Sequence, residues 1–306
     1  MIKRFFQFLV LAFFIWVGYL VVYKSPEQKL MDEAVLSQET KNTFTEGFEK
    51  VNSFSDLFKE DWSGWHEIIV QNNSFSVRRP IRYCMINMAS CLTSERLGNY
   101  IEIEKNIRRR GAQSLKFYAA PFGKKWFGDS RAAIRRQLFD FKKDDDIYFT
   151  GWFYFKGPDT DKASELQNLN HSLFLSFRSY NNSLRNFGEP GPALFFNFRN
   201  SISLRFDNWL PAIDNAEQDL LERVNTPLNE WVEIKMHLKL SDKPSEGLIE
   251  VWMNDKKIIA ERAKTLPTPN MVYSILEVGI GSNLNQEESQ TMYVDNISVS
   301  PTRFND

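Results

Sequence analysis

The chain has 306 residues, of which 42% are hydrophobic and 14% aromatic, including 26 phenylalanines. This composition can bury a large core, which excludes a disordered protein, and the length fits one large domain with an appendage. Because 38 Lys and Arg residues balance 39 Asp and Glu residues, the formal net charge is −1. No overall field attracts nucleic acid, so we expect no nucleic-acid partner, and any electrostatic recognition must be local.

The first feature along the chain is a 19-residue apolar run at residues 5–23, in which Gln7 is the only strongly polar side chain. A helix of this length spans roughly the 30 Å hydrocarbon core of a bilayer. No small-residue cleavage site follows the run, which favours an uncleaved signal anchor in the lipid bilayer. Lys3 and Arg4 precede the run and acidic residues follow Lys24, so the positive-inside rule places residues 1–4 in the cytoplasm and the rest of the chain outside it.

Residues 24–45 predict a short helical stalk, because Ser25, Pro26 and Gln28 have the form of a capping box with Pro at the first helical position. A folded domain is expected at residues 46–306. In an oxidising compartment Cys84 and Cys91 could close a small disulfide loop, and the alternative is two buried thiols. So few cysteines favour a single-pass protein of a bacterial inner membrane that faces the periplasm over a eukaryotic cell-surface protein.

From about residue 66 onward, apolar and polar residues alternate in short runs separated by turn residues, which predicts β-strands. The twelve expected strands cover residues 66–70, 100–104, 114–119, 131–141, 147–156, 172–178, 193–199, 201–206, 231–240, 247–254, 276–281 and 292–300. One helix is expected, at residues 215–224. So many strands with so few helices predict an all-β, two-sheet antiparallel sandwich and disfavour a doubly wound α/β fold.

The two faces of these strands differ in a way that bears on function. Along residues 131–141, Ala132, Ile134 and Leu138 alternate with Arg131 and Arg135. Across the expected strands, the same alternation gives a set of arginine, amide, serine and aromatic side chains on faces away from the core: Arg131, Arg135, Gln137, Trp152, Tyr154, Ser176, Arg178, Asn197, Arg199 and Arg205. If these strands adjoin, guanidinium groups would bind carboxylates or sulfates and aromatic rings would stack on pyranose rings, which predicts an acidic polysaccharide as ligand. The alternative is the ordinary solvated face of a sandwich.

Two finer expectations follow from the same alternation. In residues 172–178, Leu173, Leu175 and Phe177 are expected in the core and Phe174 on the opposite face. In residues 231–240, His237 is expected on a polar face away from the core.

Five segments in chain order carry a resemblance to a known family: GAQSLKF (111–117), SRAAIRRQL (130–138), SLFLSFRS (172–179), the stretch 231–256, and MYVDNISVS (292–300). They resemble the jelly-roll polysaccharide lyases of the heparinase I, glucuronan lyase and alginate lyase type, over roughly residues 45–301. The resemblance implies a concanavalin A-like jelly roll whose concave sheet holds an acidic polysaccharide. It also implies an Arg, Asn or Gln that neutralises the uronate carboxylate, and a Tyr or His that removes the C5 proton.

The residues that would carry lyase chemistry are only partly matched. The R-S/T-E-x-R strand of alginate lyases agrees in spacing with Arg131 and Arg135, without the Glu. The Q-I-H strand falls near residues 176–178, which lack Gln and His. The Y-F-K-x-G-x-Y strand falls on residues 274–281, where Gly281 takes the place of the catalytic Tyr. The remaining candidates for proton transfer are His171, Tyr154 and Tyr293.

Other motifs give weaker indications. Three histidines and two cysteines are too few and too scattered for a zinc site, so no metal or cofactor is predicted. The acidic residues at 144–146 and at Asp159 and Asp161 could offer oxygen ligands to calcium, but they match no known calcium loop and favour solvated turns. The basic run at residues 108–110 abuts Gly111 and is expected to form a solvated loop.

The sequence therefore predicts a membrane-anchored jelly roll that faces outward and recognises an acidic, uronate-type polysaccharide. Two alternatives remain. The first is an active β-eliminating polysaccharide lyase. The second is a structural or scaffolding subunit of an envelope assembly, in which the same face binds a protein partner.

Overall fold

A computed structural model describes residues 43–49, 57, 65–72, 75–80, 98–121, 130–157, 171–180, 187–197, 201–206, 220–283 and 289–303. The expected membrane segment, most of the expected stalk, and Cys84 and Cys91 lie outside the described residues. Within the described residues, no helix has the length and apolar character needed to cross a membrane. The described strands all belong to one compact unit, residues 42–306.

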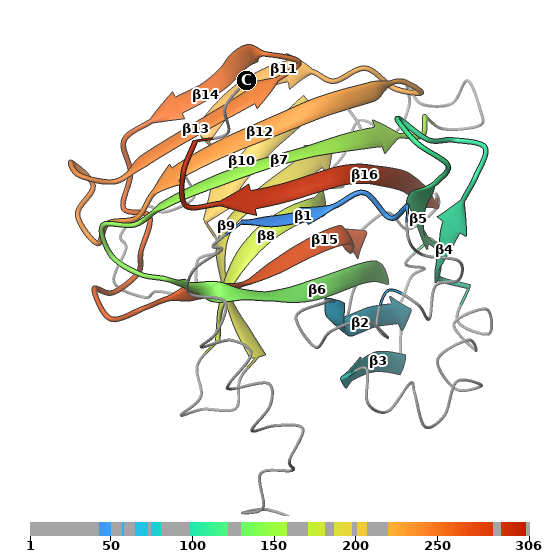
Figure 1. Cartoon of the computed structure of the whole chain (residues 1–306), viewed down its shortest axis with the longest axis horizontal. Helices are drawn as coiled ribbons and strands as arrows, with labels where there is room; N and C mark the ends of the chain where they lie inside the picture. The colour runs from blue at the N-terminus through green and yellow to red at the C-terminus, as the bar shows by residue number, and fades with distance from the viewer. Residues whose placement is uncertain are drawn as a thin grey trace, which may run out of the picture. The chain divides into compact units, whose positions relative to one another are not determined.

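The strands form two antiparallel sheets, which we call sheet A and sheet B (Figure 1). Sheet A runs in the order β14 (Lys256–Glu261), β13 (Leu248–Met253), β12 (Trp231–Lys239), β7 (Asp146–Phe155), β16 (Gln290–Ser300), β5 (Ser114–Ala119) and β4 (Tyr100–Glu104), and β1 (Phe44–Glu46) also pairs with β16. Sheet B runs in the order β11 (Leu220–Asn225), β10 (Ser201–Phe206), β9 (Phe187–Asn197), β8 (His171–Tyr180), β15 (Tyr273–Asn283), β6 (Ser130–Phe141), β2 (Trp65–Asn72) and β3 (Phe75–Pro80).

One hydrophobic core joins the inner faces of the two sheets. Phenylalanines of β7 in sheet A meet those of β8 in sheet B. The ring centroid of Phe174 lies 5.1 Å from that of Phe153 and 5.2 Å from that of Phe155, and Phe149 meets Phe177 edge to face at 6.4 Å. Edge-to-face aromatic pairs add about 0.5–1.5 kcal/mol each to the burial of their area. The predicted all-β, two-sheet antiparallel sandwich is confirmed.

All twelve expected strands are present, and four further strands were not expected: β1, β3, β11 and β14. The helix expected at residues 215–224 is wrong over its described part, because Leu220–Asn225 is strand β11. Val224 pairs with Ile202 of β10, so neighbouring strands override a local sequence that favours a helix. The sequence did contain a signal for β14, the turn-forming pair Asn254 and Asp255. In the structure these residues have positive φ angles of 48° and 65° and form the two-residue turn of the β13–β14 hairpin.

A bulge in β8 reverses part of the expected face pattern. Leu173 pairs with Phe195 and Leu175 with Leu194, so Phe174 is an extra residue in β8. Phe174 therefore points into the core, while Leu173 packs with Ala193 apart from the main core. The expectation was wrong for both Leu173 and Phe174, because strict alternation fails at a bulge.

His237 lies on the outer face of sheet A, as predicted. Its Nε2 atom is 2.7 Å from Oδ1 of Asp146 and its Nδ1 atom is 3.0 Å from Oε2 of Glu250. The imidazole stacks on the ring of Tyr148, with centroids 4.3 Å apart and an interplanar angle of 3°. The polar face of β12 is thus tied to both neighbouring strands.

Candidate functional site

The expected site residues lie on two different sheets. Trp152 and Tyr154 belong to β7 and Tyr293 to β16, all in sheet A. The residues on sheet B strands are Arg131, Arg135, Gln137, His171, Ser176, Arg178, Asn197 and Arg205, and Arg199 lies outside the described residues. The expectation that arginines and aromatic rings share one surface is therefore wrong, because the hydrophobic core separates them.

On sheet B, strand register aligns one residue from each of six strands in a single row. The pairs, each directly opposite, are Glu67 with Arg135, Arg135 with Glu277, Glu277 with Ser176, Ser176 with Ala193, and Ala193 with Arg205. The alternate positions on these strands, such as Ile134 and Leu276, are in the core. The row therefore lies on the outer face of sheet B.

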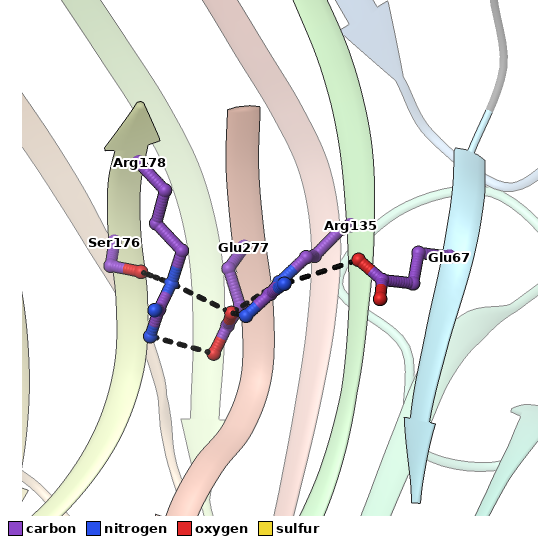
Figure 2. A network of polar contacts seen from close by, with 5 residues as sticks. All are labelled: Glu67, Arg135, Ser176, Arg178 and Glu277. Carbon is purple, nitrogen blue, oxygen red and sulfur yellow. Dashed lines mark hydrogen bonds and ion pairs between the residues drawn. The ribbon is translucent and has the colours of Figure 1, made fainter. Parts of the chain in front are cut away.

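Four residues of this face form an ion-pair network, together with Ser176 (Figure 2). Arg135 donates from Nε to Glu277 Oε2 at 2.6 Å and from Nη1 to Glu67 Oε2 at 3.1 Å. Arg178 reaches the same Glu277 carboxylate from the other side, with Nε 2.8 Å from Oε2 and Nη2 3.4 Å from Oε1. Nε of Arg178 also lies 3.1 Å from the Ser176 hydroxyl. Glu277 on β15 thus joins the two strands that flank it.

The network is buried. The exposed fraction is 0% for Glu277, 2% for Arg135, 5% for Glu67 and 8% for Arg178. Burial by itself would raise the pKa of Glu277, but Arg178, Arg135 and Arg131 outweigh it and lower the pKa to about 2. Arg135 and Arg178 thus lie on the face away from the core, but each guanidinium is paired with a carboxylate of the protein.

The strand β15 departs from the lyase pattern at four of its five defined positions, and two of these bear on the chemistry. With Gly281 in the place of the catalytic Tyr, Glu277 falls in the place of the Lys, which reverses the charge. A Cβ atom at Gly281 would lie 2.6 Å from Oε1 of Glu277, so the carboxylate occupies the space a side chain would need. The described strand carries neither Tyr nor His from position 274 to position 281. Glu277, held ionised by two arginines, is a poor proton acceptor.

The other proton-transfer candidates lie away from the network: the two tyrosines are on sheet A, and His171 is on sheet B but seven residues before Arg178, roughly 20 Å along β8. Tyr154 and Tyr293 contact each other edge to face at 5.3 Å on the outer face of sheet A. Burial raises the pKa of Tyr293, which disfavours the phenolate that a base would need. His171 begins β8 and stands opposite Asn197 in register. Neither tyrosine therefore shares a face with the arginines.

The sequence interpretation missed Glu67 and Glu277. Both lie inside predicted strands. Glu277 interrupts an apolar run, Ile-Leu-Glu-Val at 275–278, and Glu67 directly precedes the apolar run at 68–70. A carboxylate in such a run requires a partner, because an unpaired buried charge is strongly destabilising. That signal could have identified the partners of the arginines.

Metal ligands are not gathered anywhere among the described residues. Residues 144–146 lie at the β6–β7 turn, as expected. The amide of Asp144 donates to the carbonyl of Leu240, and Oδ2 of Asp145 accepts from the amide of Lys142. Asp159 and Asp161, the other acidic residues weighed as calcium ligands, lie outside the described residues.

The two antiparallel sheets packed around one core define an all-β sandwich of the jelly-roll class. The sequence matches the polysaccharide lyase family over residues 58–298, and the chain belongs to that family. No curated protein matches the sequence.

Two solved structures share the architecture. An endo-β-1,4-glucuronan lyase from the fungus Trichoderma reesei is similar with a TM-score of 0.51 and 11% identity, over 67% of this chain and 87% of that one. The alginate lyase Aly36B is similar with a TM-score of 0.50 and 8% identity, over 87% of this chain and 99% of that one. At these identities the similarity is one of fold.

Proposed function

We propose that the protein binds a uronate-containing polysaccharide on the outer face of sheet B and does not cleave it. The observation that carries this proposal is the convergence of Arg135 and Arg178 on one carboxylate, Glu277, from the two strands that flank β15. Two guanidinium groups on one carboxylate are the geometry with which proteins recognise acidic groups. Membership in the polysaccharide lyase family supports a polysaccharide as the ligand.

Recognition would proceed by exchange of partners at Arg178. This residue has the largest exposed fraction of the network, and its Nη2 contact with Glu277 is the longest at 3.4 Å. A uronate carboxylate that approaches Arg178 can replace this contact while Arg135 keeps Glu277 in place. The charge of Glu277 then remains compensated, so binding does not leave a buried charge unpaired.

The proposal of binding without cleavage rests on β15. Abstraction of the C5 proton requires a base beside the arginines and donors for the developing enolate charge. Gly281 cannot supply that base, Tyr154 and Tyr293 lie on the other sheet, and His171 begins β8 seven residues before Arg178. The family match favours the second candidate function, β-elimination, which would require a base that the described face of β15 does not provide.

The proposed location follows from the apolar run at residues 5–23. We propose that this segment anchors the protein in a bacterial inner membrane and that the sandwich faces the periplasm. The anchored protein is expected to stay in the membrane fraction after a high-salt wash. A soluble form that begins near residue 25 would contradict this location.

Calorimetric titration with oligoglucuronate and oligoalginate, alongside a neutral oligosaccharide of equal length, tests the function. We expect binding of the uronates alone, without a rise in the ultraviolet absorbance of unsaturated products. Arg178→Lys keeps a cation beside Glu277 but removes the planar fork, so uronate affinity should fall about tenfold. The control is Arg262→Lys, since Arg262 is exposed and, among the described residues, hydrogen-bonds only to the carbonyl of Ser245.

Each outcome has a distinct meaning. Rising absorbance would show an active lyase and contradict the non-catalytic proposal. If no glycan binds, the scaffolding function becomes the better explanation. Equal affinity in wild type and Arg178→Lys would remove Arg178 from the recognition site.

A further inference from the structure

The loop between β4 and β5 carries positive charge that no carboxylate of the described residues neutralises in a salt bridge. It contains four cationic side chains, Lys105, Arg108, Arg109 and Arg110. Arg108 and Arg110 are exposed, and the only side-chain hydrogen bond of Arg108 to a described residue is to the carbonyl of Lys105. Across the described ranges, no carboxylate forms a salt bridge with Arg108, Arg109 or Arg110. Arg135 and Arg178 of sheet B, in contrast, pair with Glu67 and Glu277.

This loop is held in one conformation by two carboxylates that bind its backbone. Oδ2 of Asp295 accepts from the amides of Arg109 and Arg110 at 3.1 and 3.2 Å, and Oε2 of Glu49 accepts from the amide of Ala112 at 2.8 Å. Gly111 has a φ angle of 67°, a conformation that favours glycine. Asp295 and Glu49 therefore accept hydrogen bonds from backbone amides of the loop. The guanidinium groups of the loop are left available to a ligand.

Aromatic rings of sheet A lie beside the loop. The guanidinium of Arg109 sits 4.1 Å from the ring centroid of Trp152, whose strand position is directly opposite Asp295. Two residues along β7, Tyr154 contacts Trp231 at 5.7 Å, with Tyr293 on its other side. Trp152, Tyr154 and Trp231 are each partly exposed on the same outer face. Guanidinium groups and the aromatic rings of Trp and Tyr thus lie side by side on the outer face of sheet A.

We propose that Arg108, Arg109, Arg110 and Trp152 form a second binding site, on the outer face of sheet A, for an anionic oligosaccharide that carries carboxylate or sulfate groups. Exposed guanidinium forks bind these groups bidentately, and the indole and phenol rings pack against the apolar faces of sugar rings. Because the loop is already ordered by Asp295 and Glu49, binding does not have to order it. This site does not depend on the site proposed on sheet B.

A saccharide suits this surface better than a nucleic acid or a lipid surface. The net charge of −1 gives no long-range attraction for a polyanion, and Glu49 and Glu104 border the loop, which disfavours a densely charged ligand. An anionic oligosaccharide carries single, spaced anionic groups with apolar ring faces between them. These features match a cationic loop that lies beside aromatic side chains.

The test is calorimetric titration of the full chain with a heparin-derived hexasaccharide, and with cellohexaose as the neutral probe. Arg108→Gln with Arg110→Gln should weaken binding of the anionic probe about tenfold or more, because charge-assisted hydrogen bonds are lost. Trp152→Ala should weaken it several-fold and Trp152→Phe should restore it. The control is Lys256→Gln with Lys264→Gln, which removes two charges from the opposite edge of sheet A.

Unchanged affinity in the loop variant, or an equal loss in the lysine control, would overturn the proposal. So would preferential binding of a DNA oligonucleotide or of phosphatidylglycerol vesicles over the hexasaccharide. The two proposed sites are separable. Arg178→Lys should leave the loop site intact, so if uronate binding on sheet B fails, the loss caused by the loop variant remains measurable.

Discussion

Gly281 and Glu277 lie so close together on β15 that a side chain at position 281 and the observed Glu277 conformation exclude each other. A Cβ atom there would be 2.6 Å from Oε1 of Glu277 and would also overlap the side chain of Leu173. Arg135 and Arg178 hold the carboxylate in place from both sides. The Glu277 carboxylate therefore occupies the space beside position 281, where the lyase pattern has a tyrosine.

We expect Gly281→Ala to lower the free energy of unfolding by about 1–3 kcal/mol, because overpacking forces fixed neighbours to shift. Urea denaturation of the purified protein measures the change. Leu173→Ala in the same chain should recover part of the loss, since it removes one of the two overlaps. Equal stability of wild type and Gly281→Ala would contradict the observed packing.

Removal of the Glu277 carboxylate should leave two buried arginines without their shared partner. We expect Glu277→Ala to cost about 3–5 kcal/mol of stability. Added acetate should restore part of it by entering the vacated position, whereas chloride at equal ionic strength should not. The same acetate titration of wild type serves as the control, and a lack of acetate-specific recovery would argue against a carboxylate-binding arginine pair.

Stability should also depend on the ionisation of Glu277 at acidic pH. Its pKa is about 2 in the folded protein, below the ordinary value of 4.5 for an unfolded chain. The contribution is thus fully present above pH about 4.5 and is lost as the pH falls toward 2. Thermal unfolding between pH 6 and 2 should show a steeper loss for wild type than for Glu277→Gln, which lacks the titrating group. Parallel curves would show that this carboxyl does not titrate differently on folding.

The stacked histidine on sheet A gives an independent prediction. His237→Ala removes the contacts with Asp146 and Glu250 and the stacking on Tyr148, and leaves two carboxylates facing one another. We expect a loss of about 1 kcal/mol, typical of cross-strand pairs at a partly exposed site. Lys239→Ala, two residues further along β12 and exposed, is the control and should change stability little. A denaturant midpoint for His237→Ala equal to that of the control would assign no stabilising role to the cluster.

The sequence predicted the sheets better than it predicted the site, for physical reasons. Period-two alternation is a local property, so all twelve expected strands were found. Pairing between distant strands is not local, and it decided that β7 lies in sheet A and β6 in sheet B. The ion pair of Arg135 with Glu277 depends on that pairing, as does the inward turn of Phe174 at a bulge. Alternation therefore placed Arg135 and Arg178 on faces away from the core, but it could not show that carboxylates of neighbouring strands neutralise them.

The pairing of β1 with β16 makes the first and last strands of the compact unit hydrogen-bonded neighbours. Phe44 stands opposite Val299, and the Ser298 hydroxyl donates to the carbonyl of Phe44 at 2.9 Å. A short linker between these two strands could join the polypeptide into a ring without disturbing either sheet. The chain could then be opened at the Asn254–Asp255 turn instead, which would give a circular permutant whose new ends lie at the far edge of sheet A.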